Sequence, residues 1–131
     1  MISLAHFEMR HNCKLEKPSQ ESKIWPHMHA SLDGLWRAPN ILVESKAPAF
    51  WKHTMALCGL VPDTYVDQLQ AQLFVYESEL NYYVSFHDGQ PESHQYAEVA
   101  VGRDEKRIKE IVERCKYFWV LVERGIWYDG F

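Results

Sequence analysis

The sequence predicts a single α/β domain, residues 1–131, in which helices flank a small mixed sheet. The chain has 131 residues, which is enough for one domain with a hydrophobic core. Its expected elements follow the order helix, strands, helix, strands, helix, which is typical of this class. A buried strand at 41–46 and an amphipathic helix at 104–124 are the clearest of these elements.

The first half of the chain is organised around the strand at 41–46, Ile-Leu-Val-Glu-Ser-Lys, which ends before Pro48. Ahead of this strand the patterns predict, in order, a helix, a polar loop, a short strand and a turn region, at residues 3–11, 14–23, 25–30 and 33–40. A short helix is expected after the strand, at 49–58.

The second half contains two longer predicted helices. The first begins after Pro62, with Asp63 as its cap, and extends to about residue 76. The second occupies 104–124, where apolar residues recur at helical spacing, and Gly125 is expected to end it. Two strands are expected between these helices, at 82–86 and 96–101.

The composition argues against several functional classes. The formal net charge is −4, so DNA binding would need local basic clusters or a metal that offsets the acidic residues. The cysteines are odd in number and widely spaced, which argues against a disulfide framework and against zinc. No apolar run reaches membrane-spanning length, and the N-terminus has no signal-peptide pattern. We therefore expect an intracellular protein with no membrane partner.

Three charged residues on or near the strand at 41–46 form the candidate site. Glu44 and Lys46 lie two apart, so both side chains project from one side of that strand. Asp33 lies upstream, beyond a predicted turn, so the chain can bring its carboxylate back to Glu44. Two carboxylates are hard oxygen ligands suited to Mg²⁺ or Mn²⁺, and an adjacent ammonium can orient or deprotonate a water. This combination indicates metal-assisted phosphodiester hydrolysis.

Simpler interpretations of the same patterns remain open. Asp33-Gly34 is also a turn signal, and a Glu and a Lys two apart also fit the exposed face of an edge strand. His27 and His29 would point the same way on a strand, but we expect them to be surface histidines rather than zinc ligands.

Two basic residues close to the site in sequence, Arg37 and Lys52, are candidates for contacts with DNA phosphates. The last helix is richer in Lys and Arg, but acidic residues alternate with them, which indicates an exposed face with ion pairs. Adjacent aromatic residues, as at Tyr82-Tyr83, are compatible with base stacking, although core packing or a subunit interface is the simpler explanation.

Five short segments occur in the order and spacing of a known family. They are Ala-Ser-Leu-Asp-Gly-Leu at 30–35, Leu-Val-Glu-Ser-Lys-Ala-Pro at 42–48, Tyr-Val-Asp-Gln-Leu-Gln at 65–70, Tyr-Tyr-Val-Ser-Phe at 82–86 and Arg-Asp-Glu-Lys at 103–106. Together they resemble the lambda-exonuclease-like group of the PD-(D/E)XK nuclease superfamily, which includes the YqaJ-type viral recombinases. The resemblance covers about residues 25–124 and implies a restriction-endonuclease-like core.

The resemblance implies a role for each matching residue. Asp33 and Glu44 would coordinate Mg²⁺ or Mn²⁺, aided by the backbone carbonyl of Ser45. Lys46 would position or activate the attacking water and stabilise charge on the phosphate, and Gln68 would support the site.

The implied function is a divalent-metal-dependent deoxyribonuclease of phage or prophage recombination, acting in the cytoplasm of a bacterial host cell. The best-known members of the family are exonucleases that degrade one strand of linear duplex DNA from its 5′ end, and some form ring-shaped trimers. The expected partner is therefore linear duplex DNA, with a homo-oligomer as a further expectation.

One departure from the family concerns its N-terminal region. Family members carry an earlier helix, G..yE..AR, whose Glu completes the metal site, and the matching position here falls just before Met1. Glu8 corresponds to a later part of that helix, so it is not expected to replace that ligand. A site without this Glu would bind metal weakly and cut slowly. The alternatives are therefore a weak or inactive nuclease-fold module that binds DNA or a host protein, or a fragment of a longer nuclease.

Overall fold

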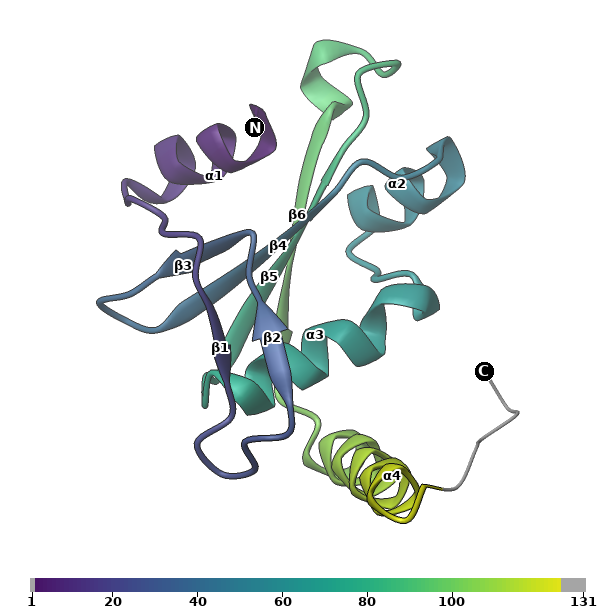
Figure 1. The fold of residues 1–131 in the computed structure, drawn as a ribbon. Coiled ribbons are helices and arrows are strands. Elements are labelled where there is room, and N and C mark those ends of the chain that lie inside the picture. Colours follow the sequence, from purple (N-terminus) through teal and green to yellow (C-terminus); the bar gives the residue numbers. More distant parts are fainter. Residues whose placement is uncertain (1, 126–131) are drawn as a thin grey trace.

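A four-stranded mixed sheet forms the centre of the protein (Figure 1). The structure is a computed structural model and describes residues 2–125. β4 and β5 run parallel, whereas the two outer pairs of the β3-β4-β5-β6 order are antiparallel. The four strands are β3 (Gly34–Trp36), β4 (Ile41–Lys46), β5 (Leu80–Phe86) and β6 (Tyr96–Gly102). The predicted fold class, an α/β domain with a small mixed sheet flanked by helices, is confirmed.

Helices cover both faces of this sheet (Figure 1). On one face Phe7 of the first helix packs against Val43, and on the other face Leu69 packs against Tyr83. Because side chains alternate along β4, Glu44 projects to the face opposite Val43, under the second and third helices. The helices are α1 (Ile2–His11), α2 (Phe50–Leu57), α3 (Asp63–Val75) and α4 (Glu105–Glu123). No helix within residues 2–125 combines the length and apolarity that a membrane crossing requires.

Helix α3 lies between the sheet and helix α4. Parallel strands cannot be joined by a tight turn, and α2 and α3 form the crossover that connects β4 to β5. Helix α4 packs on α3, where Ile108 and Val112 join Leu73 in one hydrophobic cluster. A two-stranded hairpin also contacts α3, and a short 3₁₀ helix precedes β6; these elements are β1 (Ser19–Glu21), β2 (His29–Ser31) and η1 (Glu92–His94).

The two ends of α4 follow local sequence signals. Asp104 is the N-cap, and its carboxylate accepts a hydrogen bond from the backbone N–H of Arg107 at 3.1 Å. Gly125 has φ +68°, a left-handed conformation that glycine adopts without a steric penalty, and it directly follows the C-cap residue, Arg124. The expected stop at Gly125 is therefore confirmed.

Three expectations for local structure were wrong. Asp63 does not cap α3, because Pro62 is the N-cap and Asp63 is already the first helical residue. The polar loop at 14–23 contains β1, and the turn region at 33–40 contains β3. Each of these two strands is three residues long, too short for a periodic pattern, and each is held by pairing with another segment.

Candidate active site

The three charged residues that the sequence singles out meet at the carboxyl end of β4. Glu44 and Lys46 project from the same face of the strand, and Lys46 Nζ lies 3.3 Å from Glu44 Oε1. The β3-β4 register pairs Gly34 with Val43, so Asp33 comes opposite Glu44. Asp33 Oδ2 accepts a hydrogen bond from the backbone N–H of Ser45 at 2.9 Å. Two carboxylates and an ammonium thus share one end of a central strand.

Helix α3 holds the Glu44 carboxylate in place. Gln68 Nε2 donates to Glu44 Oε1 at 3.0 Å, and Gln72 Nε2 donates to Glu44 Oε2 at 2.8 Å. Glu44 is only 4% exposed, and of its two donors Gln72 is buried whereas Gln68 is exposed, so water can take the place of Gln68 but not of Gln72. The two glutamines lie one helical turn apart, which is the spacing that lets both reach one carboxylate.

The surroundings of Glu44 favour its protonated form. Burial raises the pKa of this carboxyl, and the negative charge of Asp33 raises it further. The hydrogen bond from Gln72 and the positive charge of Lys46 oppose this rise without cancelling it. A cation bound next to Glu44 would therefore relieve an electrostatic cost that the protein bears in its absence.

Gln72 is a site residue that the sequence reasoning did not assign. Besides its bond to Glu44, its Nε2 donates to the Ser31 carbonyl at 3.2 Å, and its Oε1 accepts from Asn81 Nδ2 at 2.9 Å. The side chain is 2% exposed and so ties the site to β2 and β5. Its spacing of four residues from Gln68 was the available signal.

Lys52 lies beside the site, where its ammonium contacts the same tyrosine ring as Lys46. Lys46 Nζ lies over the Tyr65 ring, 5.2 Å from its centroid, and Lys52 Nζ lies over the same ring at 5.1 Å. Helix α2, which carries Lys52, is anchored by His53, a buried residue whose ring contacts Ser85 Oγ at 2.7 Å. The structure therefore brings two of the predicted lysines to one ring.

Arg37, in contrast, lies at the other end of the sheet hairpin. Its neighbour Trp36 pairs with Ile41, at the start of β4, and Lys46 is at the end of that strand, about 16 Å away at the usual rise per residue. The guanidinium of Arg37 pairs with Glu16 at 2.7 Å. The structure does not bring Arg37 to Glu44.

Helix α1 contacts the site near its own first turn. Ser3 Oγ lies 2.6 Å from Ser45 Oγ, and both side chains are buried. Glu8 lies further along α1, and its Oε2 accepts a hydrogen bond from the backbone N–H of Leu15 at 2.8 Å. Its carboxylate thus stabilises the loop after α1, and Glu8 does not supply a third acid to the site.

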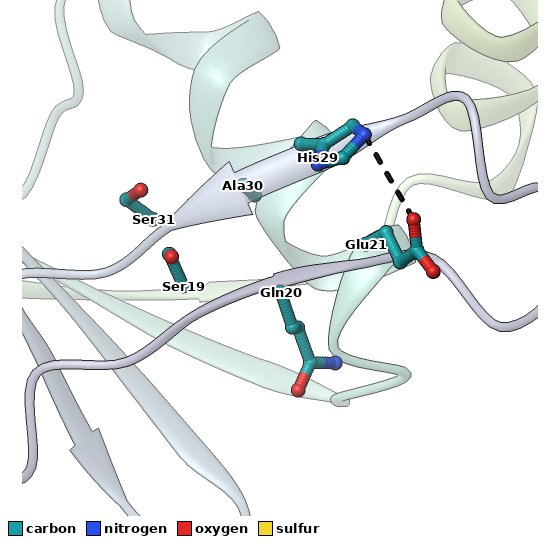
Figure 2. Close-up of a pocket in the computed structure, with 6 residues that line it drawn as sticks. All are labelled: Ser19, Gln20, Glu21, His29, Ala30 and Ser31. Carbon is teal, nitrogen blue, oxygen red and sulfur yellow. Dashed lines mark ion pairs between the residues drawn. The ribbon is translucent and has the colours of Figure 1, made fainter.

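The two histidines before Asp33 have partners away from the site. His27 stacks on Trp119 with ring centroids 4.0 Å apart. His29 Nε2 lies 4.0 Å from Glu21 Oε2 across the β1-β2 hairpin, at an open pocket of about 440 Å³ (Figure 2). Both side chains are exposed, as expected of surface histidines.

The donor set at Asp33 and Glu44 fits one hard divalent cation. Mg²⁺ usually keeps several waters and binds to one or two carboxylates together with substrate phosphates. Two carboxylates are present here, and the Ser45 carbonyl lies beside them in the chain. Across residues 2–125, no group of three or more His, Cys, Asp and Glu side chains is arranged to hold a metal. The site therefore suits a cation that takes the rest of its shell from water and phosphate.

No family model and no curated protein matches the sequence. Among solved structures, an alkaline exonuclease from Laribacter hongkongensis aligns with 95% of this chain at a TM-score of 0.85 and 24% sequence identity. The same exonuclease in complex with dAMP aligns equally well. The chain shares its fold with this exonuclease. A phage-related exonuclease from Haemophilus somnus 129PT also aligns with 95% of the chain, at a TM-score of 0.68 and 13% identity. The chain spans 64% of the length of the Laribacter protein. The fold implied by the resemblance is thus confirmed.

Proposed function

We propose that this protein is a divalent-metal-dependent deoxyribonuclease that hydrolyses phosphodiester bonds of DNA. One observation carries the proposal: Asp33, Glu44 and Lys46 converge at the end of β4, in a nuclease fold, with Glu44 buried and oriented by two glutamines. A buried carboxylate beside a second one is costly unless a cation uses both. This cost favours a metal-dependent role over a merely structural one.

In the proposed mechanism, the residues of this chain bind the metal, orient the attacking water and neutralise charge on the phosphate. Asp33, Glu44 and the Ser45 carbonyl would hold Mg²⁺ or Mn²⁺, which supplies Lewis-acid stabilisation of the phosphate and acidifies a water. Lys46, beside Glu44, orients the attacking water and neutralises charge that develops on the phosphate. Gln68 and Gln72 keep the Glu44 carboxylate directed at this point.

The proposed substrate is linear duplex DNA attacked from an end, which the exonuclease neighbours support. Lys52, next to Lys46 at the Tyr65 ring, would contact phosphates near the cleaved bond, and Arg37 would contact DNA beyond the other end of β4. We also propose a role in phage or prophage recombination in the bacterial cytoplasm, and a homo-oligomer that encloses the DNA.

Digestion of 5′-labelled linear duplex DNA with Mg²⁺ or Mn²⁺ tests the proposal. Lys46→Ala should lower the cleavage rate by about 10²–10⁴-fold, because it removes the group next to the reacting phosphate. Lys106→Ala, which changes an exposed lysine on α4, is the matched control and should cleave as the wild type does. EDTA should stop cleavage by the wild type and by Lys106→Ala. Cleavage by Lys46→Ala at the wild-type rate would contradict the assignment.

A second candidate function is a nuclease-fold module that binds DNA or a host protein with little or no catalysis. The observation that favours it is the small donor set, two carboxylates without a third acid among the residues described. Metal binding discriminates between the two candidates. A working site should gain about 2.7 kcal/mol of stability at a metal concentration 100-fold above Kd, whereas a degenerate site should show no such thermal shift.

A further inference from the structure

An exposed aromatic and basic surface begins at the active-site lysine and extends over the first turn of α2. Phe50 and Trp51 are the first residues of this helix, and they are 59% and 60% exposed. Lys52 follows them and is half-buried. Two large exposed rings in succession on a short helix leave apolar surface in water, and such surface usually marks a binding site.

Three ring contacts join this surface to the candidate active site. Lys46 Nζ lies 5.2 Å from the Tyr65 centroid, Lys52 Nζ lies 5.1 Å from the same centroid, and Lys52 Nζ lies 5.3 Å from the Trp51 centroid. The order Lys46, Tyr65, Lys52, Trp51 is therefore continuous in space, and cations alternate with rings along it. We call this set the α2 strip.

The charges of the α2 strip fit an anionic partner. Lys46 has an acidic neighbour in Glu44, but no ion pair engages Lys52 within residues 2–125. Its ammonium instead contacts two rings and the Thr64 hydroxyl, the latter at a long 3.4 Å. A cation held by rings rather than by a carboxylate stays available to a phosphate. A basic and aromatic surface of this kind is the arrangement that binds single-stranded nucleic acids.

We infer that the α2 strip is a binding platform for single-stranded DNA, in which Trp51 stacks on an unpaired base and Lys52 contacts the strand's phosphates. The inference rests on the proposed function for its choice of nucleic acid. Inside a duplex both faces of each base are covered by its neighbours, so an exposed ring such as Trp51 stacks most readily on an unpaired base at or beyond the end of the helix. The platform would hold the strand whose phosphates pass Lys46, or its unpaired continuation. An unpaired end is thus the proposed ligand.

Binding of a fluorescein-labelled oligothymidylate of about 12 nucleotides, measured by anisotropy in EDTA, tests this inference without any cleavage. An abasic oligomer with the same number of phosphates separates stacking from charge. Trp51→Ala should weaken oligothymidylate binding by about 5- to 150-fold and leave binding of the abasic oligomer unchanged. Trp51→Phe should recover most of the loss. Lys52→Ala should weaken both oligomers alike and reduce the salt slope by about 0.7.

Tyr117→Ala is the matched control, because Tyr117 is 65% exposed on α4, away from the α2 strip, and this change should leave both affinities unchanged. Three results would overturn the inference: wild-type affinity in Trp51→Ala, an equal loss on both oligomers in that variant, or no oligothymidylate binding by the folded wild type. The outcome is separable from the proposed hydrolysis, because a protein that binds through Trp51 yet fails to cleave duplex DNA refutes only the nuclease activity.

Discussion

Replacement of Gln72 by leucine isolates what buried hydrogen bonding contributes at the Glu44 carboxylate. Gln72→Leu keeps a side chain of similar size on α3 but removes every hydrogen bond of the amide. Glu44 Oε2, the Ser31 carbonyl and Asn81 Nδ2 each lose a partner. Gln68→Leu is the matched comparison, because Gln68 also donates to Glu44 from the same helix but is exposed to water.

The expected magnitudes differ because only one of these sites is buried. A hydrogen bond to a charged group contributes about 1.5–3 kcal/mol and a neutral one about 1 kcal/mol, so Gln72→Leu should cost about 3–5 kcal/mol. In a chain of 131 residues that corresponds to a fall in Tm of about 10–20 °C. At Gln68 water can replace the lost donor, so the cost should be about 0.5–1 kcal/mol, or about 2–4 °C.

Urea and thermal unfolding of the two variants beside the wild type measure this difference. Because the Gln72 hydrogen bond opposes the raised pKa of Glu44, Gln72→Leu should also move that pKa further upward, as carboxyl titration would show. Equal destabilisation by the two substitutions would refute the reasoning, since it would mean that burial does not distinguish the two donors. A Gln72→Leu protein as stable as the wild type would show that the amide network adds nothing.

Two further predictions concern groups around the site. Burial raises the pKa of Glu44, and a protonated carboxyl does not bind a cation, so the rise in Tm with Mg²⁺ or Mn²⁺ should be larger at about pH 8 than at about pH 5. Without metal, the pH dependence of stability has the opposite sign. The native state holds the Glu44 proton more tightly than the unfolded chain does, because the pKa of this carboxyl is raised on folding. The contribution of Glu44 to stability therefore falls as pH rises from the ordinary carboxyl pKa through the raised one. Equal metal shifts at both pH values, in scanning fluorimetry, would contradict metal ligation by Glu44. Burial raises the pKa of the Tyr83 hydroxyl to about 12 although the Ser85 hydroxyl lies near it, and the group makes no hydrogen bond of normal geometry among the described residues, so Tyr83→Phe should be neutral or stabilising by up to about 1 kcal/mol in urea denaturation. A loss of stability of more than about 1 kcal/mol in Tyr83→Phe would show that the hydroxyl has a hydrogen-bond partner.

Much of the framework was predictable because its signals are local. The strand at 41–46 and the helices on 3–11, 49–58 and 104–124 follow from short-range patterning, and the structure places them within a residue or two. The errors at β1 and β3 have the opposite cause. Those strands are three residues long and exist because β2 and β4 lie beside them, which no local pattern records.

The candidate site also combines features set by local sequence with features set by contacts between distant segments. Local sequence was enough to place Glu44 and Lys46 on one face of a strand, because side-chain alternation depends only on the backbone of that strand. It also determined that Asp33 could return to them, because a short hairpin limits how far the chain can travel.

The other side chains of the site come together only through packing between separate elements. Gln72 contacts Glu44 because α3 crosses that face of the sheet, and Lys52 contacts the same ring as Lys46 because its helix, α2, brings it to the first turn of α3, which carries Tyr65. Arg37 is close to Asp33 in sequence but lies at the far end of the β3-β4 hairpin. The antiparallel pairing that places Asp33 opposite Glu44 also places Arg37 beyond the start of β4. Contacts between elements depend on packing across the whole chain, and sequence proximity does not measure it.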